Sequence, residues 1–243
     1  MRTIIAAAAV WAVFGISMSA RADGLILKLP QDATWAVYKA EGYKTRGDKS
    51  KEKVTGWLRI SSVGKTAESG EPCRWLEIEN SYKTDVGDRR QIEKLLVPEK
   101  YLTEGEAPAE HIVRGWFQFD HLPEQGKPAP LSLLEGRPHS RGSAYYLCGP
   151  SADAVQLSPA AVACKLGEPL CAGRKGSHTV KLQNGDRTAD VHFTFEVRLH
   201  DDAPFGVVSY QQAVTGPDGR EAMQKFVLDD FGPTAVSRLP KQQ

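Results

Sequence analysis

The chain has 243 residues, of which 41% are hydrophobic and 25% are charged, and its formal charge at pH 7 is +1. This is the composition of an ordinary globular protein. A net charge so close to zero excludes the strong basic field expected of a nucleic-acid-binding protein, so we expect no nucleic-acid partner.

The first 22 residues have the three parts of a secretory signal peptide. Arg2 supplies a positive charge, residues 4–18 are almost unbroken apolar sequence, and Ala20-Arg21-Ala22 matches a cleavage site. The apolar run is short for a membrane span, although an N-terminal anchor helix is the alternative. We predict that residues 1–22 are removed and that no transmembrane segment remains. The mature protein is then periplasmic or secreted.

The rest of the chain, residues 23–243, contains no internal repeat and no low-complexity linker, so we expect a single domain. Short apolar runs predict strands at residues 25–29, 35–38, 54–60 and 73–78. The basic run at residues 39–53 fits either a solvated hairpin tip or an anionic-ligand patch, and hairpin tips are the commoner case. Residues 61–70 are expected to be a polar turn region.

Three tryptophans of these early strands are the candidate ligand-binding residues: Trp35, Trp57 and Trp75. Alternation places Trp57 and Trp75 opposite the apolar pairs Leu58/Ile60 and Leu76/Ile78. Their face also carries three charged residues, Arg59, Glu77 and Glu79. Either a helix covers the indoles, or they line an aromatic groove that holds an amphipathic ligand.

The middle of the chain alternates between short strands and turns. A strand is predicted at residues 91–97, ended by Pro98, and one helical turn at 99–102. Residues 108–117 are the best helix candidate because Pro108 suits a first turn and apolar residues follow on one side. Residues 122–142 predict an extended surface loop, and a strand is expected at 145–148. Residues 155–164 suit either a short helix opened by Ser158-Pro159 or two short strands around a turn, and we favour strand.

The last third has the clearest pattern. From Val191 to Leu199 apolar and polar residues alternate without interruption, which predicts a long half-buried strand within residues 188–200. Asn184-Gly185 precedes it as a hairpin signal. With residues 178–183, 207–214 and 221–228 it forms a four-strand antiparallel meander, and residues 229–243 are expected to be a short turn and a frayed end.

Four cysteines follow the cleavage site: Cys73, Cys148, Cys164 and Cys171. An even number in an oxidising compartment predicts at least one disulfide, with Cys164–Cys171 preferred because Gly167 and Pro169 can turn the chain between them. Free buried thiols and a metal site are the alternatives. The spacing matches no familiar zinc motif, so we expect no metal.

No catalytic motif is recognisable. The chain has no G-x-S-x-G elbow and no G-x-G-x-x-G loop, and Ser62-Val-Gly-Lys65 matches S-x-x-K without its partner motifs. His200-Asp201-Asp202 offers an imidazole and two carboxylates, but a polar strand end needs the same residue types for solvation. We therefore expect no catalytic residue, no cofactor and no enzymatic activity.

Three blocks carry a resemblance to known proteins: residues 56–77, Lys94-Leu-Leu-Val-Pro-Glu-Lys-Tyr-Leu102 and Pro204-Phe-Gly-Val-Val208. They resemble uncharacterised secreted proteins found mostly in planctomycete bacteria. The last block, beside a long strand, is also similar to the half-barrel of periplasmic lipoprotein carriers of the LolA/LppX/RseB type. The N-terminal helix usual in those carriers is not evident here, and the resemblance implies no catalytic residue.

Together these features predict a mainly β protein: a curved antiparallel sheet, half-barrel or sandwich-like, with one or two short helices. The expected function is an exported, non-enzymatic binding or carrier module for a lipid or other apolar or amphipathic ligand. The alternatives are an envelope structural or interaction protein without a small ligand, and a hydrolase with an unrecognised site.

Overall fold

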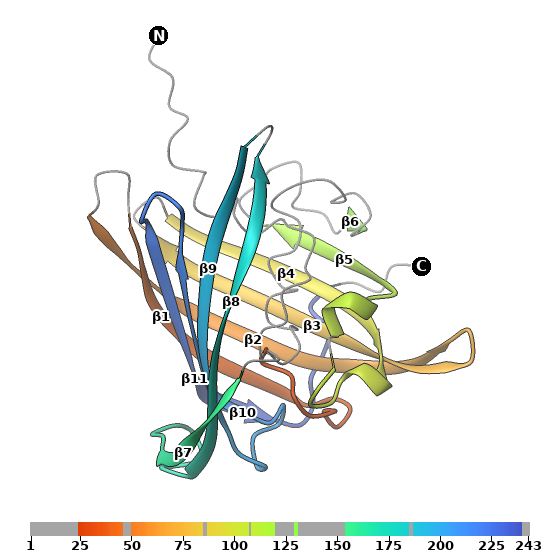
Figure 1. Ribbon diagram of the computed structural model, residues 1–243. Helices are drawn as coiled ribbons and strands as arrows, with labels where there is room; N and C mark the ends of the chain where they lie inside the picture. The colour runs from red at the N-terminus through yellow and green to blue at the C-terminus, as the bar shows by residue number, and fades with distance from the viewer. Residues whose placement is uncertain are drawn as a thin grey trace.

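The computed structural model describes residues 24–45, 50–84, 87–106, 108–119, 129–130, 154–184 and 187–239. These residues form one unclosed antiparallel sheet of 11 strands and two single-turn 3-10 helices (Figure 1). The predicted mainly β class is confirmed. The predicted signal peptide, the strand expected at 145–148 and most of the loop expected at 122–142 lie outside the described residues.

The strands are β1 (Trp35–Thr45), β2 (Lys51–Glu68), β3 (Glu71–Thr84), β4 (Gly87–Pro98), β5 (Arg114–Phe119), β6 (Ala129–Pro130), β7 (Val155–Ala161), β8 (Leu170–Asn184), β9 (Arg187–Leu199), β10 (Val207–Thr215) and β11 (Glu221–Gly232). The helices are η2 (Glu99–Tyr101), at the predicted helical turn, and η3 (Pro108–His111).

Two meanders meet in the middle of this sheet. Strands β1 to β6 follow one another in order, and so do β7 to β11, and the two halves join where β1 pairs with β11. The first and last strands therefore lie in the middle of the sheet, while β6 and β7 form its edges.

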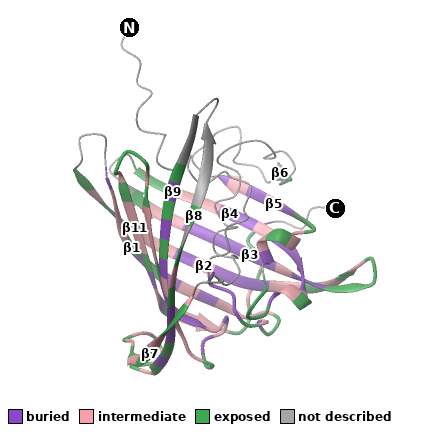
Figure 2. Cartoon of the chain, in the orientation of Figure 1, coloured by how far each residue is buried: buried purple, intermediate pink, exposed green. Residues whose placement is uncertain are grey.

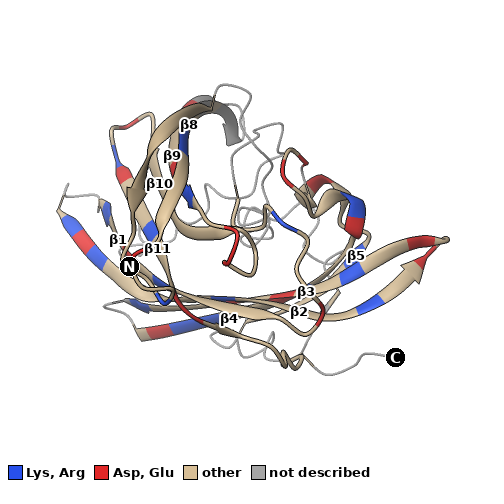
Figure 3. Ribbon diagram, turned by 90° about the horizontal axis from the view of Figure 1, so that it is seen from below, with Lys and Arg blue, Asp and Glu red and all other residues tan. Residues whose placement is uncertain are grey.

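The sheet is strongly curved, and its hydrophobic core lies on the concave side, which we call the inner face (Figure 3). Alternate residues of β1 to β4 and of β9 to β11 point to this face, among them Tyr38, Leu58 and Phe226. Segments outside the strands fill the concavity: Leu25 to Leu27, Leu102, and Ala203 with Phe205 are all buried there. The opposite, convex side is the outer face.

Two glycines allow the sheet to bend sharply. A Cβ at Gly42 would lie 2.0 Å from the carbonyl oxygen of Met223, and a Cβ at Gly56 would lie 2.0 Å from that of Ser81. Both positions are on adjacent strands, β1 and β2, so no side chain fits where the neighbouring backbones approach.

The long alternating strand is confirmed as β9. Val191, Phe193, Phe195 and Val197 are buried, whereas His192 and Thr194 are exposed (Figure 2). It pairs with β8 and β10, and β11 completes the predicted meander. The basic run also forms the expected hairpin, because Thr45 of β1 pairs with Lys51 of β2.

The polar turn expected at residues 61–70 is wrong, because β2 continues to Glu68. The β2–β3 pair passes a register shift between Ser62 and Lys65 and then projects beyond its neighbours (Figure 1). Water reaches both faces of this projecting β-hairpin, so residues 61–68 can be polar and still form a strand. The turn itself is two residues, Ser69 and Gly70, both with positive φ as a type I′ hairpin requires.

The helix expected at residues 108–117 is also wrong. Only Pro108–His111 forms a single helical turn, and Arg114–Phe119 is strand β5, paired with β4. Arg114-Gly-Trp-Phe-Gln-Phe119 alternates: Phe117 and Phe119 are buried towards the inner face and Trp116 points to the outer face. The apolar residues of this segment suit a helix or a strand equally well, and the strand forms because it can pair with the edge of β4.

Candidate functional site

Four tryptophans mark the outer face of the sheet. Trp35, Trp57 and Trp75 lie on β1, β2 and β3, and Trp116 lies on β5; pairing registers place all of them opposite the core, and each is half-buried. The three predicted ligand-binding tryptophans thus share one face, as alternation indicated for Trp57 and Trp75. Trp116 was missed because its segment was expected to be helical.

Cationic side chains lie over two of these indoles. The Arg59 guanidinium is 4.5 Å from the Trp35 ring centroid. Lys94 Nζ and the Arg114 guanidinium lie 5.6 Å and 5.7 Å from the Trp75 ring. Each distance is within the range of a cation–π interaction. Burial, with a smaller contribution from the positive charge of Arg238, lowers the pKa of Arg59.

Trp75 and Trp116 form an aromatic pair on this face. Their ring centroids are 5.3 Å apart with planes inclined at 36°. Trp116 is directly opposite Lys94 in the β4–β5 pairing, so two indoles and two cations form one cluster, Trp75, Trp116, Lys94 and Arg114, which we call the indole–cation cluster.

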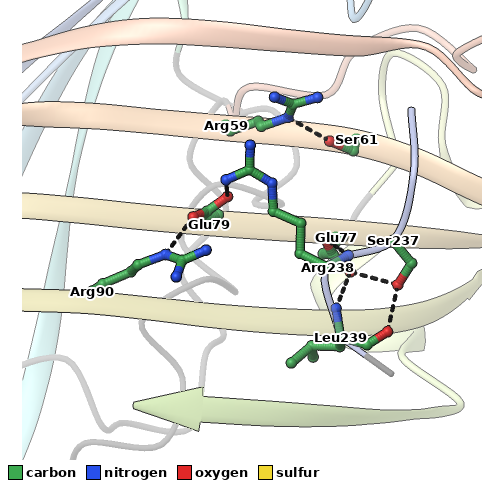
Figure 4. A network of polar contacts seen from close by, with 8 residues as sticks. All are labelled: Arg59, Ser61, Glu77, Glu79, Arg90, Ser237, Arg238 and Leu239. Atoms are coloured by element: carbon green, nitrogen blue, oxygen red, sulfur yellow. Dashed lines mark hydrogen bonds and ion pairs between the residues drawn. The ribbon is translucent and has the colours of Figure 1, made fainter. Parts of the chain in front are cut away.

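Two buried carboxylates lie beside this cluster. Glu77 and Glu79 are 3% and 1% exposed, although their strand positions point to the outer face. The residues that bury them belong to the C-terminal end of the described chain, residues 233–239, which we call the strap. The frayed end expected from the sequence is therefore wrong: β11 extends to Gly232, and the strap crosses the sheet (Figure 4).

The strap donates hydrogen bonds to both carboxylates. Glu77 accepts hydrogen bonds from Ser237 Oγ (2.7 Å) and from the backbone N–H groups of Arg238 (2.9 Å) and Leu239 (3.2 Å). Glu79 accepts from the guanidinium groups of Arg238 (2.6 Å) and Arg90 (2.5 Å), as Figure 4 shows. Buried charges with this many donors are compensated.

The strap contacts Trp35 directly and is linked to Trp75 only through Lys94. The Trp35 indole N–H donates to the carbonyl of Pro233 at 3.1 Å. At the other end Lys94, which lies over Trp75, donates to Ser237 Oγ at 2.9 Å. Leu239 is buried, 2% exposed. Part of the face is therefore covered by this chain itself, a cover that neither sequence interpretation of the tryptophans included.

The candidate catalytic and metal-binding group at the end of β9 has local contacts. His200 Nδ1 accepts the backbone N–H of Asp202 at 3.2 Å and lies 3.7 Å from the Asp202 carboxylate. Ser62 Oγ accepts from Arg74 and donates to Asp32. Within the described ranges, no three His, Cys, Asp or Glu side chains are arranged to hold a metal ion.

The described cysteines correct the preferred disulfide pairing. Cys73, Cys164 and Cys171 are free thiols, so the preferred Cys164–Cys171 bond is not formed; Cys148 lies outside the described residues. Cys164 instead forms an isolated bridge with Gly167, and Cys171 pairs with Ala160 of β7. A short sequence separation permits a disulfide but does not impose it.

Native-state alkylation is expected to distinguish these thiols. Burial raises the pKa of Cys73 and of Cys171. At the same pH, a smaller fraction of each thiol is therefore in the reactive thiolate form than in an unfolded chain. Iodoacetamide at pH 8 followed by mass spectrometry should modify both about tenfold or more slowly in folded than in urea-unfolded protein. The half-buried Cys164 is the internal control. A non-alkylated Cys164–Cys171 pair in unreduced protein would contradict the free-thiol state.

Comparison with known proteins adds little to this geometry. No family model and no curated protein matches the chain. One solved structure with some similarity is a beta-barrel-like protein of the domain of unknown function DUF1849 from Brucella abortus. It has 8% identity and a TM-score of 0.26, and covers 85% of this chain and 99% of that chain.

A second solved structure, described as "a putative lipoprotein" from Parabacteroides distasonis, has 9% identity and a TM-score of 0.33. It covers 88% of this chain and 100% of its own. Both TM-scores are below 0.5, so neither likeness establishes a shared function. In the part of the chain that the structure describes, no helix has the length and apolar character to cross a membrane.

Proposed function

We propose that the protein is an exported, non-enzymatic binding or carrier module for an apolar or amphipathic ligand, such as a lipid. In this proposal residues 1–22 are a signal peptide and residues 23–243 act as one domain in the periplasm or outside the cell. The observation that carries it is the indole–cation cluster on the outer face.

The cluster combines the properties that such a ligand needs. Half-buried indoles offer flat apolar surface, and Trp is favoured where a surface is apolar on one side and wet on the other. Arg114 is half exposed, and its ion pair with Glu68, at 3.0 Å, is itself exposed and hence weak. A ligand with an apolar chain and an anionic head can therefore use Trp75 and Trp116 for the chain and Arg114 for the head.

Tryptophan fluorescence tests this proposal directly. All described tryptophans lie on the outer face, so intrinsic emission of the mature chain reports on that face. We expect titration with an anionic single-chain lipid, below its micellar concentration, to shift the emission saturably. Trp75→Phe/Trp116→Phe should remove most of the response, and Trp57→Phe should retain it.

Charge variants refine the same experiment. Arg114→Ala should raise the dissociation constant about two- to fivefold, since an exposed cation contributes about 0.5–1 kcal/mol. The matched control is Arg89→Ala, an exposed arginine on β4 whose register is that of the inner face. Unchanged emission of the wild-type protein, with no lipid detected by native mass spectrometry after purification, would refute the proposed ligand site.

A further inference from the structure

Ser237 of the strap joins two oppositely charged side chains of the outer face. Its hydroxyl accepts a hydrogen bond from Lys94 Nζ at 2.9 Å and donates one to Glu77 at 2.7 Å. Lys94 and Glu77 are directly opposite each other in the β3–β4 pairing, and opposite charges at such positions stabilise a sheet by contacting each other. The hydroxyl therefore bridges a cation and the carboxylate that the register places beside it.

Glu77 receives its other hydrogen bonds from the strap as well. The backbone N–H groups of Arg238 and Leu239 donate to it at 2.9 Å and 3.2 Å. Together with the hydroxyl, these donors compensate the buried carboxylate. The ammonium of Lys94 lies 5.6 Å from the centre of the Trp75 ring, within the range of a cation–π interaction. The strap thus satisfies Glu77 while Lys94 remains over the indole.

The two cations of the indole–cation cluster are held differently. The side chain of Arg114 is 50% exposed and its partner Glu68 is 35% exposed, so this pair fixes the guanidinium only weakly. Lys94 is half-buried, and its ammonium is hydrogen-bonded to Ser237, which is itself hydrogen-bonded to the buried Glu77. A charge that is held in place before binding loses less conformational freedom when a ligand arrives, and partial burial reduces its screening by salt.

We propose that Lys94 determines the specificity of the ligand site for a negatively charged head group, and that Ser237 of the strap is the residue that positions it. This inference rests on the proposed function and deepens it, because it names single-chain lipids with an anionic head as the preferred ligands over neutral lipids with the same chain. Trp75 and Trp116 contact the chain of either lipid. Without the hydroxyl of Ser237, the ammonium moves towards Glu77 and leaves the indole.

The test compares dodecanoate with its neutral glycerol monoester at pH 8. Each is titrated into the mature chain below its micellar concentration and followed by tryptophan emission. We expect the wild-type chain to bind dodecanoate about tenfold or more tightly than the ester, because hydrogen bonds to charged groups are strong. Ser237→Ala and Lys94→Met should each reduce this preference about five- to tenfold and change the affinity for the ester less than about twofold.

A double variant shows whether the serine acts through the lysine. Ser237→Ala/Lys94→Met should bind dodecanoate as Lys94→Met does, whereas a merely structural serine would add its own loss and would weaken binding of the ester too. Ser237→Thr keeps the hydroxyl and should keep the preference. Val236→Ala is the matched control on the strap, since Val236 is 76% exposed. If Ser237→Ala does not fold, Ser237→Cys, with a similar size and a weakly accepting sulfur, replaces it.

The outcomes distinguish this inference from the proposed function. If the wild-type chain binds both lipids and the single variants leave its preference unchanged, the roles of Lys94 and Ser237 are overturned while the ligand site stands. Additive losses in the double variant, or an equal loss in Val236→Ala, would overturn the positioning role of Ser237. If the wild-type chain binds neither lipid, the proposed function fails and this inference fails with it.

Discussion

Replacing Phe195 or Phe193 with alanine is expected to destabilise the protein by about 3–5 kcal/mol, the usual cost of a cavity left by a buried phenylalanine. Phe193 is 1% exposed and Phe195 is 4% exposed. Phe195 also packs against Gly176 of β8, where a Cβ would lie 2.7 Å from its ring. The removed ring therefore leaves a space that the neighbouring strand cannot readily fill.

The matched controls are the next residues of the same strand. His192 and Thr194 are exposed, so His192→Ala and Thr194→Ala should change the free energy of unfolding by less than about 0.5 kcal/mol. Urea denaturation of the four variants gives the comparison. Equal losses on both faces of β9 would mean that the strand is buried on both sides and that the alternation has been misread.

Arg74→Met is expected to cost about 3 kcal/mol, at the lower end of the range for breaking a buried ion pair. Arg74 is 2% exposed, and its guanidinium donates to Glu99 (2.6 and 2.9 Å), to the carbonyl of Pro30 (2.6 Å) and to Ser62 Oγ (3.0 Å). Methionine fills much of the volume but leaves these acceptors without a donor. Arg74→Lys should also destabilise the protein, because one ammonium cannot reproduce the planar arrangement of donors of a guanidinium.

An exposed ion pair close by provides the control. Lys100 and Glu71 are 2.8 Å apart, but their side chains are 54% and 51% exposed. Lys100→Met should therefore cost less than about 1 kcal/mol. The double variant Arg74→Met/Glu99→Leu should recover part of the loss, since it removes the unpaired carboxylate. Similar melts for Arg74→Met and Lys100→Met would contradict this account of the buried arginine.

The strands of the last third were predictable because the necessary information is local. Alternation along β9 determines which side chains face the core, and Asn184-Gly185 and residues 215–219 mark the connections from β8 to β9 and from β10 to β11. The same rule placed Trp57 and Trp75 opposite Leu58 and Leu76, so one face of the candidate site followed from residue spacing alone.

Errors arose where two local patterns were equally acceptable or where polarity was misread. Residues 108–117 carry apolar residues at spacings that suit a helix or a strand, and pairing with β4 decided for the strand. The polar residues of 61–68 suggested a turn, but in a hairpin that projects into water both faces of a strand tolerate polar side chains. Cys164 and Cys171 are close in sequence, yet they are free thiols.

By itself, then, the sequence determined the all-antiparallel β class, the inner and outer faces of the main strands and the shared face of Trp57 and Trp75, because these properties depend on residues two positions apart. The tertiary structure alone decided what covers that face. Glu77 accepts a hydrogen bond from the backbone N–H of Arg238, 161 positions away in the sequence. A local pattern of apolar and polar residues cannot predict a contact between such distant segments. A buried carboxylate signals only that some donor must reach it, and the curvature of the sheet and the course of the strap after Gly232 determine which donor does.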